Sequence, residues 1–492
     1  MSNKNVLAFD LGASSGRGIV AGFDGKKIEL NEIHRFVHNF SVMRGRAYWD
    51  LPYLYESIKE GLLKSPDIES FGFDTWGVDM ALLDKAGNIV GLPLSYRDSA
   101  LTADNMNKTL ALLGDGDIEK GEKKIFDSTF IASLDYNTIY KLRYLLENFK
   151  YQVDAADTML FLPNLLEYLF SGVKHTEYTI ASTSQMYNMK EKDWAYDILR
   201  ELSIPERLLT KVDGSETVLG DISPDIADYT RKAGAKVISV SGHDTACAVA
   251  AVPAKEESFT FLSSGTWSLM GISSKTLLSG DNVIKSKISN EGTYDGGYRP
   301  TVNITGLWII QELRRNFKNE GKDYSFAQMA AMAGEAGVSE SYINPDDFDA
   351  PGNYIVSIRE YLKNTNQKVP ETDAELISVV LTSLALKYKD VYMSFKEFIT
   401  WEEKLYIIGG GVNNKLLCQY TANALNIPVI LGPSEATAVG NVMEQFEALG
   451  EYSTREEKSE ILSASFESET YEPRDTAVWE EAYEKYKKIM GD

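Results

Sequence analysis

Cysteine is scarce in this chain, with Cys247 and Cys418 alone among 492 residues. Two thiols are too few for a disulfide framework, which fits a reducing compartment, and we expect a cytoplasmic protein. No apolar run has the length that a membrane span needs. The polar start, residues 1–5, leads straight into a predicted strand and lacks the pattern of a signal peptide.

Positive charge is also in short supply. Lys and Arg number 50 against 72 Asp and Glu, so the formal net charge is −22. Such an acidic chain suits neither nucleic acid nor an anionic membrane as a partner, and we expect neither. A phosphate ligand must therefore be held by local dipoles and a metal ion. The length of 492 residues exceeds what one core supports and predicts two or three domains.

Both common phosphate-binding motifs are missing. Residues 16–21 match G-x-G-x-x-A in form but lead into a strand, whereas the dinucleotide motif opens a helix, and no Gly-Lys-Ser/Thr loop is present. The chain opens instead with a turn rich in glycine and serine, from Gly12 to Gly16, and with an Asp24-Gly25 hairpin signal. The apolar runs around these turns predict strands at residues 6–9, 18–23 and 27–36.

The middle of the chain carries a candidate catalytic carboxylate. Residues 236–240 are apolar and β-branched and predict a strand, which runs into Ser241-Gly242-His243-Asp244-Thr245. An aspartate just past a strand end, where a glycine lets the backbone turn, is a good place for a general base. Taken by itself, this stretch favours a second role for Asp244, the capping of a helix that begins at Thr245, which is common for aspartate. This stretch alone leaves both roles open.

A second polar loop follows the strand predicted at 71–73. Residues 74–79, Asp-Thr-Trp-Gly-Val-Asp, combine two carboxylates, an indole and a glycine. Sugar rings bind against aromatic faces, and Asp and Asn side chains take their hydroxyl groups. Trp76 fits ordinary core packing as well, so its role stays open. The region from 101 to 235 is predicted to be mostly helical.

The second half repeats the pattern of the first. Strands predicted at 258–262 and 267–272 enclose a Ser-Ser-Gly-Thr turn at 263–266, so we expect two related domains. Another predicted strand, 405–408, ends in three glycines at 409–411, which let a flat ring such as adenine approach the backbone. Further predictions are helices from Asp50, after Gly306 and from Ser434 or Glu435, a strand at 428–431, and a solvated helical tail at the C-terminus.

The glycine and serine turns suit a nucleotide. Consecutive backbone N–H groups together with serine hydroxyls bind phosphate oxygens. The turns at 12–16 and 264–266 are therefore expected to grip the phosphates of one nucleotide. Arg17 is placed to neutralise a transferring group, and Asp10, at the end of the first strand, is a candidate ligand for Mg²⁺, directly or through water.

The joint order of these motifs resembles the FGGY carbohydrate kinases, from about residue 5 to 450. The resemblance rests on five segments, which are residues 10–17, 74–79, 242–245, 263–268 and 409–411. It implies an α/β protein of two actin-like ATPase (ribonuclease H-like) domains. Each is expected to be a mixed sheet flanked by helices, with the active site in the cleft between them. The expected parts are an N-terminal domain at 1–250, a C-terminal, nucleotide-binding domain at 251–450 and a tail at 451–492.

The resemblance also implies roles for single residues, with ATP and Mg²⁺ as cofactors. Asp244 would be the base that takes the proton of the sugar hydroxyl, and Asp10 would serve the metal. The residues expected at the sugar are Gly77, His243, Thr245 and Asn303, to which the polar loop adds Trp76 and Asp79. The residues expected at ATP are Ala13, Ser14, Ser15, Gly16, Arg17, Thr266, Gln311 and Gly410, to which the triple glycine adds Gly411.

The expected acceptor is O1 of a 6-deoxy-ketohexose. Within the family the chain looks most like the branch acting on L-rhamnulose, which gives L-rhamnulose 1-phosphate in rhamnose catabolism. L-Fuculose, a ketopentose such as xylulose, gluconate or glycerol are the alternatives. The 6-methyl group needs an apolar wall, for which Trp76 is the candidate. An actin-like chaperone or filament ATPase would share the phosphate turns but has no use for the sugar-facing residues. We expect a monomer or homodimer.

Overall fold

The structure, a computed structural model, describes residues 4–491. The chain forms two compact units that do not follow its order. Unit 1 comprises Met1–Lys255, Ser274–Pro300 and Ala436–Ser465, and unit 2 comprises Glu256–Ser273, Thr301–Glu435 and Phe466–Asp492. The domain boundaries expected at 250 and 450 stay a prediction. The division into units also shows that the chain returns to unit 1 after residue 435.

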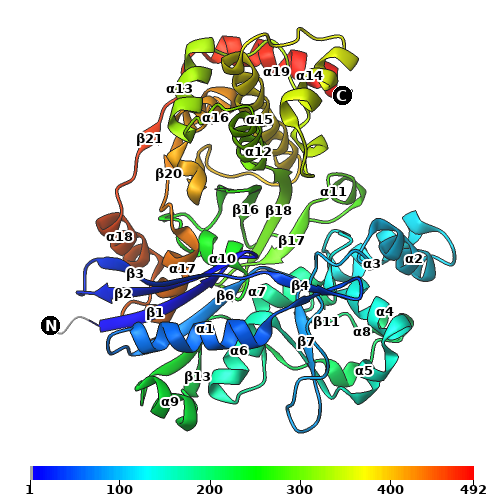
Figure 1. The fold of residues 1–492 in the computed structure, drawn as a ribbon, viewed down its shortest axis with the longest axis vertical. Coiled ribbons are helices and arrows are strands. Elements are labelled where there is room, and N and C mark those ends of the chain that lie inside the picture. Colours follow the sequence, from blue (N-terminus) through cyan, green and yellow to red (C-terminus); the bar gives the residue numbers. More distant parts are fainter. Residues whose placement is uncertain (1–3, 492) are drawn as a thin grey trace. The chain divides into compact units, whose positions relative to one another are not determined.

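Unit 1 is built on a six-stranded mixed sheet of order β13-β14-β6-β1-β2-β3 (Figure 1). β1 pairs with β2 antiparallel, from Lys4↔Phe23 to Leu11↔Gly16, and with β6 parallel. Gly25, at φ +92°, sits in the β2–β3 turn, as the Asp24-Gly25 signal predicts. The strands are β1 (Lys4–Leu11), β2 (Ser15–Phe23), β3 (Ile28–Val37), β6 (Ser70–Thr75), β13 (Thr217–Asp221) and β14 (Lys236–Ser239).

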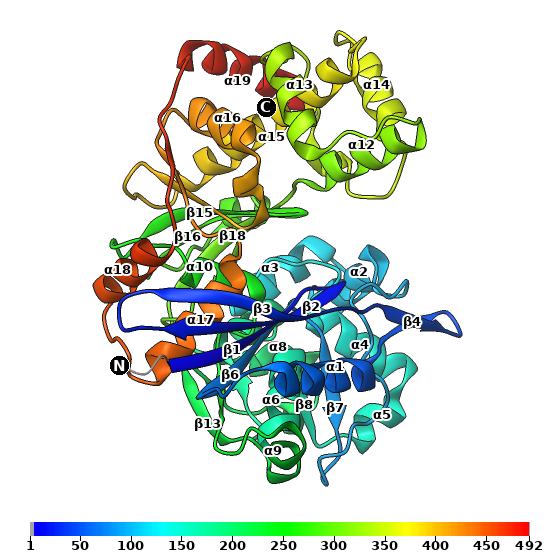
Figure 2. The same ribbon diagram turned by 60° about the vertical axis from the view of Figure 1, so that its left-hand side comes forward.

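Strand β6 shows how this sheet is covered on both faces. Alternate residues of a strand point to opposite sides. Phe73 packs against Phe170 of α6, with ring centroids 5.5 Å apart. Asp74, the next residue, accepts a hydrogen bond from Asn441 of α17 on the other side. Although it comes late in the chain, α17 lies beside β1 and β6 in both views (Figures 1 and 2). These helices are α6 (Leu162–Ser171), α17 (Ala436–Ala448) and α10 (Asp244–Ala250), which packs on α17.

The region from 101 to 235 is less helical than expected. Six short strands alternate there with helices, and Pro163 stands in the first turn of α6, directly after β8. A buried cluster that extends from Met80 to Leu208 forms a second core of unit 1. The remaining strands of the unit are β4 (Phe40–Met43), β5 (Arg46–Trp49), β7 (Met80–Leu83), β8 (Thr158–Phe161), β9 (Thr176–Glu177), β10 (Tyr187–Asn188), β11 (Asp193–Trp194), β12 (Val212–Asp213) and β17 (Ser289–Gly292). Its other helices are α1 (Leu51–Lys64), α2 (Ala103–Leu113), α3 (Ile118–Thr129), α4 (Thr138–Asn148), α5 (Lys150–Ala155), α7 (Tyr178–Ala181), α8 (Tyr196–Glu201), α9 (Pro224–Thr230), α11 (Asp281–Lys285) and α18 (Arg455–Ser465), with 3-10 turns η1 (Ser182–Ser184) and η2 (Glu206–Leu208).

Unit 2 repeats the strand pattern of unit 1. Its strands run β18-β16-β15-β19-β20-β21, with β15 antiparallel to β16 and parallel to β19. The strands are β15 (Phe259–Ser264), β16 (Trp267–Ser273), β18 (Tyr298–Thr305, which begins in unit 1), β19 (Leu405–Ile408), β20 (Val429–Leu431) and β21 (Thr470–Tyr471). The helices are α12 (Trp308–Asn319), α13 (Phe326–Ala336), α14 (Tyr354–Asn364), α15 (Asp373–Phe395), α16 (Lys415–Leu425) and α19 (Thr476–Met490), with η3 (Pro345–Asp347) and η4 (Gly410–Asn413).

The two sheets confirm that the halves of the chain share one α/β architecture. In each, an antiparallel hairpin of the first two strands is extended by parallel strands from later in the sequence. The C-terminal segment departs from expectation, because Trp479 and Tyr486 of α19 are each 1% exposed and belong to the core of unit 2 rather than to a solvated tail. Both cysteines are buried and form no disulfide. Within residues 4–491, no helix combines the length and apolarity that crossing a bilayer requires.

Candidate active site

Asp244 is the first residue of α10, directly after the loop that leaves β14. The N-cap of this helix is His243, whose side chain makes no capping hydrogen bond, so the alternative that Asp244 is the cap is wrong. Oδ1 of Asp244 accepts hydrogen bonds from the backbone N–H of Thr245 at 2.6 Å and from its hydroxyl at 3.2 Å. Oδ2 accepts none from the residues that the structure describes, and a third of the side chain is exposed. One oxygen is thus held while the other stays available.

Two buried glutamates fix the backbone of the loop before Asp244. Glu444 of α17 accepts a hydrogen bond from the N–H of Ser241 at 2.6 Å, and Glu177 accepts one from Gly242 at 2.9 Å. A side chain at Gly242 would collide, since its Cβ would lie 2.9 Å from Cγ of Pro163. The sequence analysis missed both glutamates, because nothing in their local sequence connects them to a loop far along the chain.

The imidazole of His243 is enclosed by charged groups of unit 1. Nδ1 lies 2.9 Å from Nη2 of Arg299, in a hydrogen bond, and 3.2 Å from Oε2 of Glu291. Nε2 lies 3.3 Å from Oδ1 of Asp244. Burial alone would raise the pKa of the Glu291 carboxyl, but the charge of Arg299 and the contact with His243 lower this pKa to about 2. Glu291 and Arg299 were also missed by the sequence analysis.

The first glycine and serine turn joins β1 to β2, as predicted. Asp10 and Arg17 face each other across the hairpin and form an ion pair. His38, the residue directly after β3, anchors the turn, with Nε2 2.8 Å from the carbonyl of Gly12. Gly16 has no room for a side chain, because a Cβ would overlap the ring of Phe36. Among the nucleotide candidates of this turn, Ser14 is exposed, Ala13, Ser15 and Arg17 are half-buried and Gly16 is buried.

Carboxylates gather at the ends of the central strands. Asp10 and Asp74 are register partners on β1 and β6. Burial raises the pKa of Asp74 well above its ordinary value, the charges of Asp10 and Asp244 raise it further, and the hydrogen bond from Asn441 opposes the rise. Oδ1 of Asp74 is buried and has no hydrogen-bond partner among residues 4–491. Among residues 4–491 no three metal-ligating side chains converge. Mg²⁺ prefers hard oxygen ligands, which carboxylates such as Asp10 and Asp74 supply, and Oδ1 of Asp74 is an acceptor that lacks a partner in the described part of the chain. These residues therefore fit a Mg²⁺ ion that keeps most of its water ligands.

The loop after β6 is held from inside unit 1. The carboxylate of Asp79 is 1% exposed and takes hydrogen bonds from the indole N–H groups of Trp49 and Trp76 and an ion pair from Lys141. Trp76 is 5% exposed and stacks on His38 with ring centroids 5.4 Å apart. The packing role left open for Trp76 is therefore real. The expected contacts of Trp76 and Asp79 with a sugar stay predictions.

Val78 continues this loop with a strained backbone. Val78, at φ 65°, is a buried β-branched residue in the left-handed region, which is a genuine outlier and typical of functional loops. Its N–H donates to the hydroxyl of Thr183 at 3.1 Å. A Cβ at Gly77 would press on Thr183 at 3.3 Å. Loop 74–79 is thus fixed tightly in place.

The nucleotide candidates of unit 2 lie together. Nε2 of Gln311 donates to Oγ1 of Thr266 at 3.4 Å, and the N–H of Trp308 bonds the carbonyl of Thr266 at 3.1 Å. The triple glycine packs on the same turn, since a Cβ at Gly411 would overlap Oγ of Ser264. Gly410 is exposed, and a Cβ added there would meet no described atom within 4 Å. Asn303, the remaining sugar candidate, is exposed on β18 opposite Leu269.

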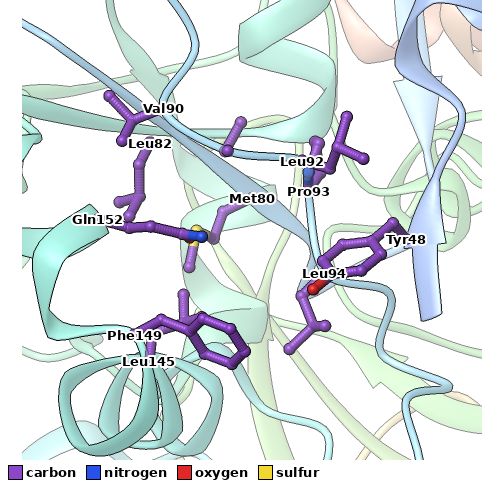
Figure 3. A pocket seen from close by; sticks show the side chains of 12 residues that line it. Tyr48, Met80, Leu82, Val90, Leu92, Pro93, Leu94, Leu145, Phe149 and Gln152 are labelled. Atoms are coloured by element: carbon purple, nitrogen blue, oxygen red, sulfur yellow. The ribbon is translucent and has the colours of Figure 1, made fainter. Parts of the chain in front are cut away.

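A small cavity elsewhere in unit 1 contains none of these residues. Its walls are mostly apolar, with Met80 of β7, Leu94 and Phe149 among them, and Tyr48 and Gln152 add polar groups (Figure 3). Its volume of about 20 Å³ accommodates roughly one water molecule. It is too small for a sugar or a nucleotide.

The two related α/β sheets are matched by family models that define the class, a carbohydrate kinase, which is an enzyme that transfers a phosphoryl group to an alcohol. The models of the FGGY family of carbohydrate kinases match in two places, the N-terminal domain at residues 5–251 and the C-terminal domain at 260–449. The chain belongs to the FGGY family of carbohydrate kinases, as the sequence motifs indicate.

Similar proteins extend over nearly the whole chain. Rhamnulokinase of Bacteroides thetaiotaomicron is 36% identical, with 99% of each chain covered. Rhamnulokinase of Ligilactobacillus salivarius is 33% identical, with 99% of this chain and 98% of that protein covered. Crystal structures of a xylulose kinase from Rhodospirillum rubrum and a gluconate kinase from Lactobacillus acidophilus superpose with TM-scores of 0.81 and 0.79 at 17% and 14% identity, each covering 99% of this chain and 98% of its own. The structural likeness confirms the fold.

Proposed function

We propose that this protein transfers the γ-phosphoryl group of ATP to O1 of L-rhamnulose, giving L-rhamnulose 1-phosphate and ADP in rhamnose catabolism. The observation that carries the proposal is the run of relatives named Rhamnulokinase, 33–36% identical over at least 94% of this chain. The more distant kinases for xylulose and gluconate share the fold at 14–17% identity and carry less weight for the substrate.

Asp244 is the proposed general base. O1 of the sugar attacks the γ-phosphorus, its proton passes to Oδ2 of Asp244, and the bond from phosphorus to the β–γ bridging oxygen breaks to release ADP. Oδ2 is the free oxygen of this carboxylate within the described part of the chain, and Oδ1 is held by Thr245. Phosphoryl transfer asks a protein mainly for positioning and charge neutralisation, with a carboxylate to orient the nucleophile. The fixed loop of residues 241–243 supplies that positioning.

The sugar is proposed to contact His243, Thr245 and Gly77 of unit 1, and Asn303 of unit 2. Trp76 and Asp79 stay in the proposal, and each is given a different role. Because the Asp79 carboxylate is saturated by Trp49, Trp76 and Lys141, its role is to hold the indole edge and the loop. The remaining ring surface of Trp76 is the proposed apolar wall for the 6-methyl group.

The nucleotide is proposed to bind through polar groups of both units. Unit 1 offers the turn from Ala13 to Arg17, and unit 2 offers Thr266, Gln311, Gly410 and Gly411. Asp10 would hold Mg²⁺ through water, with Asp74 behind it, and the ion would neutralise charge on the transferring phosphates. Arg17 shares this task from its ion pair with Asp10. We further propose a cytoplasmic monomer or homodimer, in line with two unpaired cysteines.

A substrate panel tests the proposal. ADP release, coupled to NADH oxidation, is measured with L-rhamnulose, L-fuculose, D-xylulose, gluconate and glycerol. We expect kcat/KM to be highest for L-rhamnulose, lower for L-fuculose and lowest for substrates without the 6-methyl group, since a methyl-sized contact contributes about 1–3 kcal/mol. Phosphorus–carbon coupling in the NMR spectrum of the product locates the phosphate on C1.

Each alternative outcome has its own meaning. A preference for L-fuculose would reject the sugar but keep the kinase. A preference for glycerol or D-xylulose would also remove the apolar wall assigned to Trp76. ADP release that no sugar stimulates would overturn the kinase mechanism itself.

A further inference from the structure

The buried pair of Arg299 and Glu291 has no part in the reaction as described so far. Arg299, on β18 within unit 1, is 0% exposed and forms an ion pair with Glu291 of β17. Burying a guanidinium is costly unless it is paired and hydrogen-bonded. Its Nη2 also makes the hydrogen bond to Nδ1 of His243 described above. The pair therefore meets the ring that precedes the proposed base.

The partners of Nδ1 decide which ring nitrogen of His243 carries the proton. A guanidinium has donors and no acceptor, so a nitrogen that bonds Arg299 must present its lone pair. Glu291 lies near the same nitrogen at 3.2 Å and would favour the opposite arrangement. That carboxylate is engaged by Arg299, and the shorter contact at Nδ1, at 2.9 Å, is the hydrogen bond with the guanidinium. In a neutral imidazole the bond at one nitrogen sets the role of the other.

We propose that Arg299 is a positioning residue that holds His243 as the neutral tautomer with its proton on Nε2. Nε2 lies 3.3 Å from Oδ1 of Asp244. A proton there faces the carboxylate and is available to a sugar oxygen bound beside it. The other neutral tautomer would set two lone pairs, those of Nε2 and Oδ1, against each other. The role of Glu291 is to neutralise and orient Arg299. This inference rests on the proposed function, because it assigns the donor that His243 offers to the sugar.

The tautomer can be observed without substrate. The sequence has four histidines, so long-range proton–nitrogen NMR of ¹⁵N-histidine-labelled enzyme gives a countable set of rings. The His243→Gln variant assigns its signals. At pH 8 we expect a protonated Nε2 and an unprotonated Nδ1 for His243. A proton on Nδ1 alone, or on both nitrogens, would overturn the proposal, whatever the enzyme phosphorylates.

Two variants test the part played by Arg299. Arg299→Met removes the donor and leaves the Glu291 carboxylate, so the His243 proton is expected to move to Nδ1. The kcat/KM for L-rhamnulose should then fall roughly tenfold to a hundredfold, as for other lost supporting partners, while the KM for ATP stays the same. Glu291→Gln added to Arg299→Met removes the buried charge and offers an amide N–H to Nδ1. This double variant should restore the Nε2 tautomer and part of the activity.

A control separates positioning from stability. Arg46→Met removes another guanidinium–carboxylate pair of unit 1, that with Asp98 at 2.5 Å. It should leave the His243 tautomer and the kcat/KM unchanged. An unchanged tautomer in Arg299→Met, or a double variant that is no better than the single one, would leave the ion pair a purely structural role and contradict the inference. Failure of L-rhamnulose as a substrate, with the Nε2 tautomer present, would instead reject only the proposed sugar.

Discussion

The two units contain sheets of similar arrangement, but the residues at the strand ends differ in chemistry between the two sheets. In unit 1 the strands β1 and β6 carry Asp10 and Asp74, and the loop after β14 carries Asp244. In unit 2 the equivalent strands β15 and β19 end at Ser264 and at a run of glycines. Carboxylates suit proton transfer and metal ions, whereas hydroxyls and bare backbone N–H groups suit anionic phosphates. We therefore expect the same scaffold to serve the two proposed tasks through a few strand-end residues.

The largest effect is expected when the carboxylate proposed for proton transfer is neutralised. Asp244→Asn should keep the fold and the affinity for ATP while turnover falls by roughly 10²–10⁴, the contribution of a general base. Steady-state kinetics and circular dichroism measure both. Asp228→Asn, the same change at an exposed position of α9, is the control and should have no effect. Near-normal turnover in Asp244→Asn would remove this residue from the mechanism.

Unit 2 should instead be sensitive to bulk at its glycines. Gly411→Ala puts a Cβ into Oγ of Ser264, so it should destabilise the protein by about 1–3 kcal/mol, as overpacking does, and should disturb nucleotide binding as well. Thermal unfolding and ATP calorimetry provide the measurements. Gly410→Ala has open space around it and should leave stability unchanged. Equal loss of stability in both variants would argue against this packing explanation.

A smaller effect is expected at the hydroxyl of unit 2. Thr266→Val keeps the shape but removes the acceptor of the Gln311 side chain and a donor for phosphate. One hydrogen bond contributes about 0.5–1.5 kcal/mol, so ATP affinity should fall by up to roughly tenfold. Sugar binding without nucleotide should not change in calorimetry. Equal weakening of both ligands would mean that the variant disturbs more than the nucleotide contact.

The smallest effect concerns pH and the carboxylates buried in unit 1. Burial, and then the charges of Glu444 and Glu447, raise the pKa of Glu216 to about 9. A raised pKa in the folded state means that stability is full below about pH 4.5 and is lost as the pH rises toward 9. Glu216→Gln cannot lose this proton, so its melting temperature should exceed that of the wild type by a few degrees at pH 8.5 and by less at pH 5.5. Exposed Glu257→Gln should show no such trend, and a pH-independent difference for Glu216→Gln would contradict the assignment.

Much of the fold could be predicted from local sequence. The apolar runs at 6–9, 236–240 and 405–408 became β1, β14 and β19, because a buried strand is continuous in sequence and needs little else to be recognised. The repeated strand–turn–strand pattern likewise predicted two related halves. The region 101–235 was harder, because its two-residue strands have no periodicity to read.

The candidate site residues likewise differ in how far local sequence reveals their surroundings. Asp10 lies near the end of β1, and Asp244 and the glycine turns follow strands, so their order in the chain marks them as a candidate site. Trp76 and Asp79 were recognised by type, but only tertiary structure showed that the indole is packed and the carboxylate occupied.

Local sequence was enough to predict the family, central strands of both large sheets and the aspartate that follows β14. Tertiary structure alone decided what surrounds that aspartate. The loop before Asp244 is contacted by charged residues of four elements, which are Glu177 of β9, Glu291 of β17, Arg299 of β18 and Glu444 of α17. These residues are too far from the loop in sequence for a local pattern to reveal the contacts. Buried charges need partners, and in the folded chain these partners come from segments that are distant in sequence but close in space. The helix-cap alternative for Asp244 was settled in the same way, by the backbone geometry of His243.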